Sequence, residues 1–190
     1  MLIVMNGYPG VGKLSIGRVL AEILGARLVD NHTVWNLAFA LTDRKTPAFY
    51  ETILAVRRLA DELICDLPET VPVVMTEALT VGDPFCEDYW AGIEKLSMSH
   101  DPLLVVHVRC DLEENKRRIQ SPERGLKRKP RDPDYASQNH QRARDLLGKN
   151  AEYFLELDVS ELTAEDAAQK IAGWVADVKV EHTRNAASGL

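Results

Sequence analysis

A glycine-rich segment near the start of the chain has the residue types needed to bind phosphate. Residues 7–15 read GYPGVGKLS, which fits the pattern G-x-x-x-x-G-K. In this pattern the backbone N–H groups of the loop surround nucleotide phosphates, and the lysine neutralises their charge. The predicted phosphate contacts are Gly7, Pro9, Gly10, Val11, Gly12, Lys13, Leu14 and Ser15. The segment therefore predicts a nucleotide site.

The residue after Lys13 departs from this pattern. A serine or threonine is expected there because its hydroxyl holds Mg²⁺, but the chain has Leu14 and carries a hydroxyl one residue later, on Ser15. Ser15 could reach the metal through a shift of the first helical turn. Alternatively, the nucleotide, water, Asp30 and Glu77 could hold Mg²⁺, or metal-assisted transfer could be impaired. We favour the second alternative, because Mg²⁺ keeps several waters and needs few protein ligands.

Strands that alternate with helices must position this loop. Continuous apolar runs predict strands at 2–5, 26–30, 71–76, 102–108 and 154–158. Apolar residues at helical spacing predict helices after the loop, over about 32–68, over 112–120, in RARDLLGKNAEYF and from Thr163 onward. This alternation predicts an α/β fold with a parallel sheet covered by helices on both faces. Ligands of such sheets bind beyond the carboxyl ends of the strands, where the loop, Asp30 and Glu77 would converge.

Length and composition favour one globular domain. The chain has 190 residues, of which 45% are hydrophobic and 27% charged, and we expect a domain over 1–180 and a frayed tail over 181–190. The net charge of −6 argues against a general nucleic-acid binder. Three separated cysteines indicate neither a disulfide framework nor a zinc site, and no apolar run reaches membrane-spanning length. We expect a soluble cytoplasmic protein, either a monomer or a weak homodimer.

Several segments together resemble one group of enzymes. GYPGVGKLSIGRVLAEILGARLVDNH resembles the N-terminal third of P-loop small-molecule kinases, the group of shikimate kinases and nucleoside monophosphate (cytidylate-like) kinases. VVHVRCDLEENKRRIQSPERG and LELDVSELTAEDAAQKI are similar to later segments of these kinases. The resemblance implies a P-loop NTPase fold with five strands, ATP and Mg²⁺ as cofactors, and transfer of the γ-phosphoryl group to a nucleoside monophosphate or small hydroxy compound. Residues 31–70 would form a helical substrate-binding region.

The resemblance also implies roles for polar residues that follow two of the strands. Asp30 would lie near the transferred phosphoryl group, and Glu77 would support Mg²⁺ and the substrate. His32 takes the place of a substrate-binding aspartate of shikimate kinases, and a histidine can accept a proton or bind an anionic group. Other interpretations remain: Asp30 or Asn31 could cap the helix near Thr33, Glu77 could be solvated, and His32 could be an ordinary loop residue.

Two neighbouring arginines are further candidates for binding the substrate. Arg57 and Arg58 lie off the apolar face of their predicted helix. The resemblance implies that an arginine from this region holds a substrate carboxylate or phosphate. The two side chains could instead pair with Asp61 and Glu62, although an acid that follows a base is the weaker orientation on a helix.

A segment rich in proline, glycine and charge follows the helix predicted over 112–120. Residues 121–134 read SPERGLKRKPRDPD and predict a mobile loop, although the charges could also be a solvated run or a nucleic-acid patch. The resemblance implies a lid whose Arg124 reaches the phosphates. It also implies that Arg118 stacks on adenine, although Glu114 stands four residues earlier and could pair with it.

Two other classes of function compete with a kinase. The first is a nucleotide-binding switch or sensor that transfers no phosphoryl group, but the N-K-x-D motif by which GTPase switches read the base is missing from the sequence. The second is a nucleic-acid-binding ATPase that uses RGLKRKPR, which conflicts with the acidic net charge. The sequence therefore favours a small-molecule kinase.

Overall fold

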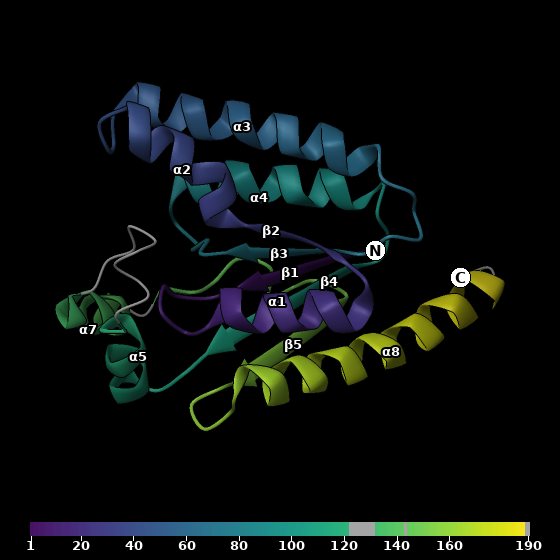
Figure 1. Cartoon of the computed structure of the whole chain (residues 1–190). Coiled ribbons are helices and arrows are strands. Elements are labelled where there is room, and N and C mark those ends of the chain that lie inside the picture. Colours follow the sequence, from purple (N-terminus) through teal and green to yellow (C-terminus); the bar gives the residue numbers. More distant parts are fainter. Residues whose placement is uncertain (122–131, 143, 189–190) are drawn as a thin grey trace.

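The computed structural model describes residues 1–121, 132–142 and 144–188, in which five strands alternate with helices (Figure 1). The strands are β1 (Leu2–Asn6), β2 (Arg27–Asp30), β3 (Val73–Glu77), β4 (Leu103–Arg109) and β5 (Tyr153–Asp158). The helices are α1 (Lys13–Leu24), α2 (Asn31–Leu41), α3 (Pro47–Cys65), α4 (Pro84–Ser97), α5 (Leu112–Ile119), α7 (Pro133–Arg142) and α8 (Ala164–Ser188). None of these described helices has both the length and the apolar character of a membrane span.

The five strands form one parallel sheet in the order β2-β3-β1-β4-β5. All five residues of the central strand β1 are buried, as its continuous apolar run predicts. The phosphate loop follows β1 and therefore lies at the middle of the carboxyl edge of the sheet. The predicted fold class, a five-stranded parallel sheet with helices on both faces, is confirmed.

Alternate side chains of β1 enter two separate cores, because successive side chains of a strand point to opposite faces. Ile3 and Met5 belong to the core that α1 and α8 cover, whereas Leu2 and Val4 belong to the core that α2, α3 and α4 cover. Figure 1 shows these two helical layers on either side of the sheet, with α5 and α7 beyond its carboxyl edge. The site is thus built on a sheet that is packed on both faces.

The helices differ from the sequence prediction in several places. The sequence analysis leaves α4 unpredicted, although Asp83 caps it by accepting hydrogen bonds from the N–H groups of Phe85 and Cys86, and Pro84 occupies its first position. The frayed tail predicted over 181–190 is wrong for 181–188, because α8 continues to Ser188. Residues 181–188 contain neither glycine nor proline, so nothing in them breaks a helix.

The helix predicted in RARDLLGKNAEYF is also wrong. Residues 144–150 are irregular, and Leu146 forms an isolated antiparallel bridge with Thr80. Gly148 has a φ of 96°, a left-handed conformation that ends any helix, and a Cβ there would lie 2.5 Å from the ring of Trp90. Close packing on α4 therefore overrides the local helical pattern.

Asn6, the last residue of β1, connects three segments beneath the phosphate loop. Its Nδ2 donates to the carbonyl oxygens of Leu79 (2.9 Å) and Leu147 (3.0 Å). Its Oδ1 accepts from the N–H groups of Gly7 and Leu79, both at 2.9 Å. The residue is fully buried, and these four bonds use every donor and acceptor site of the amide. Asn6 therefore fixes the start of the loop to the chain that follows β3 and the chain that precedes β5.

Replacing Asn6 with leucine should strongly destabilise the fold. The N–H of Leu79 would remain buried without its acceptor, and the carbonyl oxygens of Leu79 and Leu147 would each lose one of two hydrogen-bond partners. An unsatisfied buried group costs roughly 1–3 kcal/mol. We expect Asn6→Leu to lower the free energy of unfolding in urea by about 2 kcal/mol or more. The exposed Asn150→Leu control should change it by less than about 0.5 kcal/mol. Equal effects of the two substitutions would contradict this role of Asn6.

Candidate functional site

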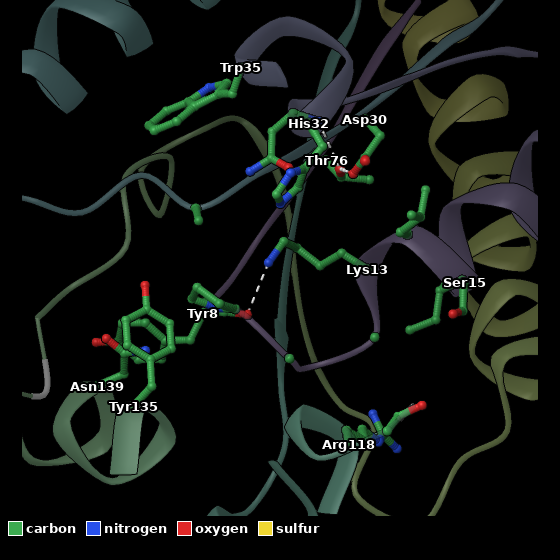
Figure 2. Close-up of a pocket in the computed structure, with 18 of the residues that line it drawn as sticks. Tyr8, Lys13, Ser15, Asp30, His32, Trp35, Thr76, Arg118, Tyr135 and Asn139 are labelled. Atoms are coloured by element: carbon green, nitrogen blue, oxygen red, sulfur yellow. Dashed lines mark hydrogen bonds between the residues drawn. The ribbon is translucent and has the colours of Figure 1, made fainter. Parts of the chain in front are cut away.

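A cavity of about 700 Å³ opens at the carboxyl edge of the sheet (Figure 2). This volume lies in the range of small-molecule sites. Its walls come from the phosphate loop, α2, α5, α7 and the start of α8. Of the predicted loop contacts, Pro9, Gly10, Gly12, Lys13, Leu14 and Ser15 line the cavity, whereas Gly7 and Val11 are buried behind it. The predicted phosphate loop therefore forms the floor of an open site.

Lys13 begins α1 and turns its ammonium group back over the loop. Its Nζ donates to the carbonyl oxygens of Gly7 and Tyr8, the latter at 3.0 Å (Figure 2). The first N–H groups of a helix have no partner within the helix, and its N-terminus carries positive potential. Gly12, the N-cap residue, has a φ of 106° and no side chain to cover these groups. The ammonium of Lys13 and the start of α1 thus place positive charge and uncapped N–H groups together at the loop, an arrangement that suits an anion.

Close packing against α5 requires glycine at the loop. A Cβ on Gly10, which has a φ of 96°, would lie 2.6 Å from the side chain of Ile119 and 2.7 Å from that of Asn115. A Cβ on Gly7 would lie 2.3 Å from the carbonyl oxygen of Val108. No side chain fits in these spaces, so the loop is held between β4 and α5.

Asp30 lies at the N-cap position of α2 and lines the cavity. Its side chain makes no capping hydrogen bond, so the capping alternative is wrong for Asp30. Its Oδ1 instead accepts from the hydroxyl of Thr76 at 2.7 Å. Figure 2 shows Asp30 and His32 on one side of Lys13 and Arg118 on the other side of the loop. Asp30 and Lys13 therefore come together as the sequence analysis expects.

One face of α2 forms an aromatic wall of the cavity. His32, Trp35 and Phe39 all line it, and the ring of Phe39 lies 6.0 Å from the rings of both other residues. The guanidinium carbon of Arg44 lies 4.8 Å from the ring centroid of Phe39. The sequence analysis identified His32 but missed Trp35, Phe39 and Arg44. The helical spacing of Trp35 and Phe39 was visible, but the same spacing is typical of a core-facing helix, and Arg44 lies in the turn after α2.

Glu77 lies behind the cavity wall, in contrast to its predicted role. Its side chain is 1% exposed and faces α3 and α4, where its Oε1 lies 3.4 Å from both the guanidinium of Arg57 and the hydroxyl of Tyr89. Burial raises the pKa of Glu77 to about 7, although the nearby cations of Arg57 and Lys13 oppose this shift. Glu77 does not line the cavity in this structure, so its assignment as a metal- or substrate-binding carboxylate stays a prediction from the sequence.

Neither of the two arginines predicted to bind substrate lines the cavity. Arg57 is buried, and its Nε donates to Asp61 at 2.5 Å, so the alternative of pairing four residues along the helix is confirmed. Arg58 is exposed on α3. Arg57 is engaged by internal partners and Arg58 lies outside the cavity, so the structure gives the predicted substrate contacts of these two arginines no support.

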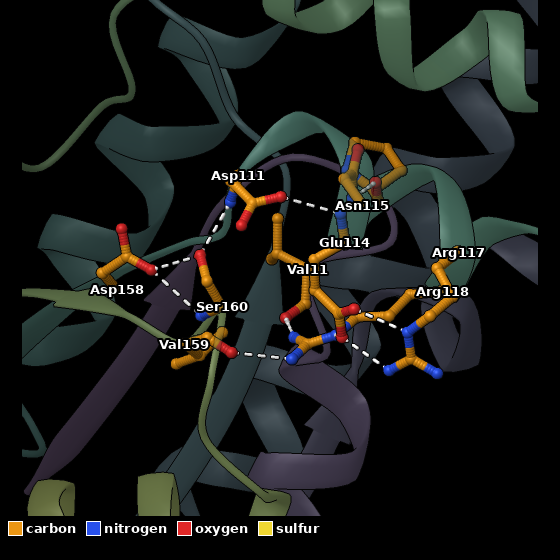
Figure 3. Close-up of polar contacts among 10 residues, drawn as sticks. Val11, Asp111, Glu114, Asn115, Arg117, Arg118, Asp158, Val159 and Ser160 are labelled. Carbon is orange, nitrogen blue, oxygen red and sulfur yellow. Dashed lines mark hydrogen bonds and ion pairs between the residues drawn. The ribbon is translucent and has the colours of Figure 1, made fainter.

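Arg118 connects the phosphate loop to the chain after β5 and also lines the cavity (Figure 3). Its three nitrogens donate to the carboxylate of Glu114 at 2.5 Å, to the carbonyl of Val11 at 2.7 Å and to the carbonyl of Val159 at 2.7 Å. Hydrogen bonds from Arg117 and Arg118 hold the pKa of Glu114 at about 2. The predicted alternative in which Glu114 pairs with Arg118 is confirmed.

The predicted lid falls largely outside the described residues. Arg124, its proposed catalytic residue, and the rest of 122–131 belong to that part of the chain. Ser121 and Tyr135, on either side of it, line the cavity. The assignment of Arg124 therefore remains a prediction from the sequence.

Several solved structures share this architecture. A sugar kinase from Janibacter sp. HTCC2649 aligns with a TM-score of 0.62 and 17% identity, covering 92% of this chain and 94% of that chain. The shikimate kinase from Acinetobacter baumannii in complex with shikimate aligns at 0.57 and 20% identity, covering 94% of each chain. The gluconokinase from Sinorhizobium meliloti 1021 aligns at 0.59 and 16% identity, covering 96% and 95%. The chain has a P-loop kinase fold.

The P-loop kinase fold is thus established by structure and not by sequence similarity. No protein-family model matches the sequence, and neither does any curated protein. The solved kinases nevertheless cover 92–96% of this chain. The fold therefore accounts for the position of the cavity, and its chemistry depends on the side chains described above.

The raised pKa of Glu77 predicts a pH-dependent stability. Its usual pKa is 4.5, so the folded state binds more protons than the unfolded state between that value and about 7. The contribution of Glu77 to stability should therefore fall as the pH rises through this window. As the pH rises from about 5 to about 8, the free energy of unfolding measured by urea titration should fall less for Glu77→Gln than for the wild type. The exposed Glu62→Gln control should follow the wild type, and a Glu77→Gln curve parallel to the wild-type curve would refute the prediction.

Proposed function

We propose that this protein is an ATP-dependent phosphotransferase that moves the γ-phosphoryl group to a small-molecule acceptor. The observation that supports this most directly is that one cavity holds the glycine loop with Lys13 and, beside it, Asp30 and His32. Phosphoryl transfer depends mainly on positioning and on compensation of phosphate charge. The loop and Lys13 supply the compensation, and Asp30 and His32 supply polar groups on the acceptor side.

The charge of the cavity supports anionic ligands. Five arginines line it, namely Arg44, Arg117, Arg118, Arg142 and Arg144. Among the described residues that line it, Asp30 is the only acid, although Glu114 beside the cavity pairs with Arg117 and Arg118. Because the whole chain has a net charge of −6, this concentration of arginines is a local feature of the site. It suits both the triphosphate and an acceptor that carries a negative charge.

Oxygen atoms at the cavity wall suit a magnesium-bound nucleotide. Asp30 and Ser15 line the cavity and would hold Mg²⁺ together with the phosphates and water, since Mg²⁺ prefers oxygen ligands. When bound, the ion neutralises charge on the phosphates. Leu14 also lines the cavity and is half-buried there, so it provides an apolar surface in place of the expected hydroxyl. Glu77 is left out of this set because it pairs with Arg57.

The acceptor would lie against α2. His32, which lines the cavity, would accept the proton of an acceptor hydroxyl, and the rings of Trp35 and Phe39 would offer a flat apolar surface. Arg44, held over Phe39, would bind a carboxylate or phosphate of the same molecule. We therefore favour an acceptor that combines an apolar or planar body with an anionic group. The nucleoside of ATP would extend the other way, toward Arg118 and residues 162–164.

Lys13→Ala should abolish most phosphoryl transfer. The ammonium of Lys13 compensates the negative charge of the phosphoryl group during transfer. Without it, we expect turnover to fall by about 10²-fold or more with the fold intact. The assay is ADP release from ATP in a screen of nucleoside monophosphates and small hydroxy acids. The exposed Lys179→Ala variant serves as control. ATP binding without acceptor-dependent ADP release by the wild type would instead favour a nucleotide-binding switch.

Arg44→Gln should specifically weaken binding of the acceptor. We expect the KM for an anionic acceptor to rise about tenfold, because a charge-assisted hydrogen bond is lost, while the KM for ATP stays constant. Arg27→Gln, at the opposite end of the sheet, is the matched control. A larger effect of Arg58→Gln than of Arg44→Gln would show that the acceptor lies elsewhere.

A further inference from the structure

Helix α5 is bonded to both segments between which the nucleotide would lie. On one side, Asn115 donates to the carbonyl of Pro9 at 3.2 Å, and Arg118 donates to the carbonyl of Val11 in the phosphate loop. On the other side, Arg118 donates to the carbonyl of Val159, and the N–H of Asp111 donates to the hydroxyl of Ser160 at 2.8 Å. Figure 3 shows Asp111, the N-cap of α5, near Ser160, and Arg118, near the end of the helix, between Val11 and Val159.

The second segment reaches the cavity directly. Val159 begins the connection from β5 to α8, and its carbonyl also accepts from the N–H of Leu162 at 3.3 Å. Leu162, Thr163 and Ala164 then line the cavity. The hydroxyl of Thr163 and the carboxylate of Asp166 bond each other at 2.7 Å, which fixes the start of α8. The hydrogen bond from Arg118 to Val159 therefore acts at the base of a rigid wall.

Glu114 determines where the guanidinium of Arg118 lies. Its side chain is only 15% exposed and accepts from Arg118 on one oxygen and from Arg117 on both oxygens. All three nitrogens of Arg118 are thus engaged by protein oxygens, two of them backbone carbonyls on different segments. A planar fork of this kind can bridge two fixed acceptors at once, which a single ammonium cannot.

We infer that Glu114 and Arg118 are positioning residues that couple the phosphate loop to residues 159–164, so that a nucleoside triphosphate binds both segments as one preorganised site. The inference rests on the proposed function, because it takes ATP as the ligand. Each segment contacts a different part of the ligand: the loop takes the phosphates, and residues 162–164 take the nucleoside. Holding the two at a fixed spacing adds affinity without any new contact to the ligand.

The test compares two ligands that use different parts of the site. Inorganic tripolyphosphate requires only the phosphate loop, whereas ATP requires both segments. Dissociation constants for both are measured by calorimetry on the wild type, Glu114→Gln, Arg118→Lys and the control Glu113→Gln. Glu113 precedes Glu114, is 82% exposed and pairs only with Lys116 among the described ion pairs.

The substitutions are expected to weaken the binding of ATP much more than the binding of tripolyphosphate. In Glu114→Gln and Arg118→Lys the preference for ATP over tripolyphosphate should fall about tenfold, a typical size for coupling between two sites. Affinity for tripolyphosphate should change much less, and Glu113→Gln should behave as the wild type. Arg118→Lys keeps the charge and its pairing with Glu114, so it isolates the bridge itself.

Three outcomes would overturn the inference: an equal loss of both affinities, no loss of either, or a wild type that binds ATP no more tightly than tripolyphosphate. The first would mean that α5 only shapes the phosphate loop. Failure of the proposed function would give a different result, because the wild type would then bind ATP but transfer no phosphoryl group to any acceptor. That result leaves the ratio of the two affinities measurable.

Discussion

Three segments of chain meet beneath the phosphate loop, and the amide of Asn6 supplies hydrogen bonds to each of them. The central strand ends at this residue, so the loop begins from a point that cannot shift without breaking buried bonds. Gly7 and Gly10 then allow the loop to pass against Val108 and Ile119. The position of Lys13, and with it the floor of the cavity, depends on this buried amide.

The alternation of side chains along β3 explains why Asp30 lines the cavity and Glu77 does not. The apolar run ends in Thr76 and Glu77, and consecutive residues of a strand face opposite sides of the sheet. Thr76 faces the cavity and orients Asp30, whereas Glu77 enters the core under α3 and pairs with Arg57. The sequence shows that the carboxylate of Glu77 stands at the end of this strand. Which of the last two residues faces the site depends on the register of the folded sheet.

Local patterns were sufficient for the sheet and the loop but not for the walls of the cavity. Buried parallel strands are continuous apolar runs, so β1 and the glycine loop were evident from the sequence. The aromatic residues of α2 have helical spacing and looked like core residues, although Trp35 and Phe39 line the cavity. The bonds from Arg118 to Val11 and Val159 join segments separated by 107 and 41 residues, a relation that no local pattern contains.

The five cavity arginines lie in a chain whose net charge is −6, and this contrast affects how a charged ligand approaches. Far from the protein, an anion is repelled by the net negative charge of the whole chain. Only near the opening of the cavity is it attracted by the arginines. Mobile salt screens exposed charges beyond about 8 Å at physiological ionic strength and screens partly enclosed charges much less. Added salt therefore removes the distant repulsion before it weakens the local attraction. The salt concentration thus affects how often an anion reaches the cavity, independently of the contacts that determine how tightly the anion is held.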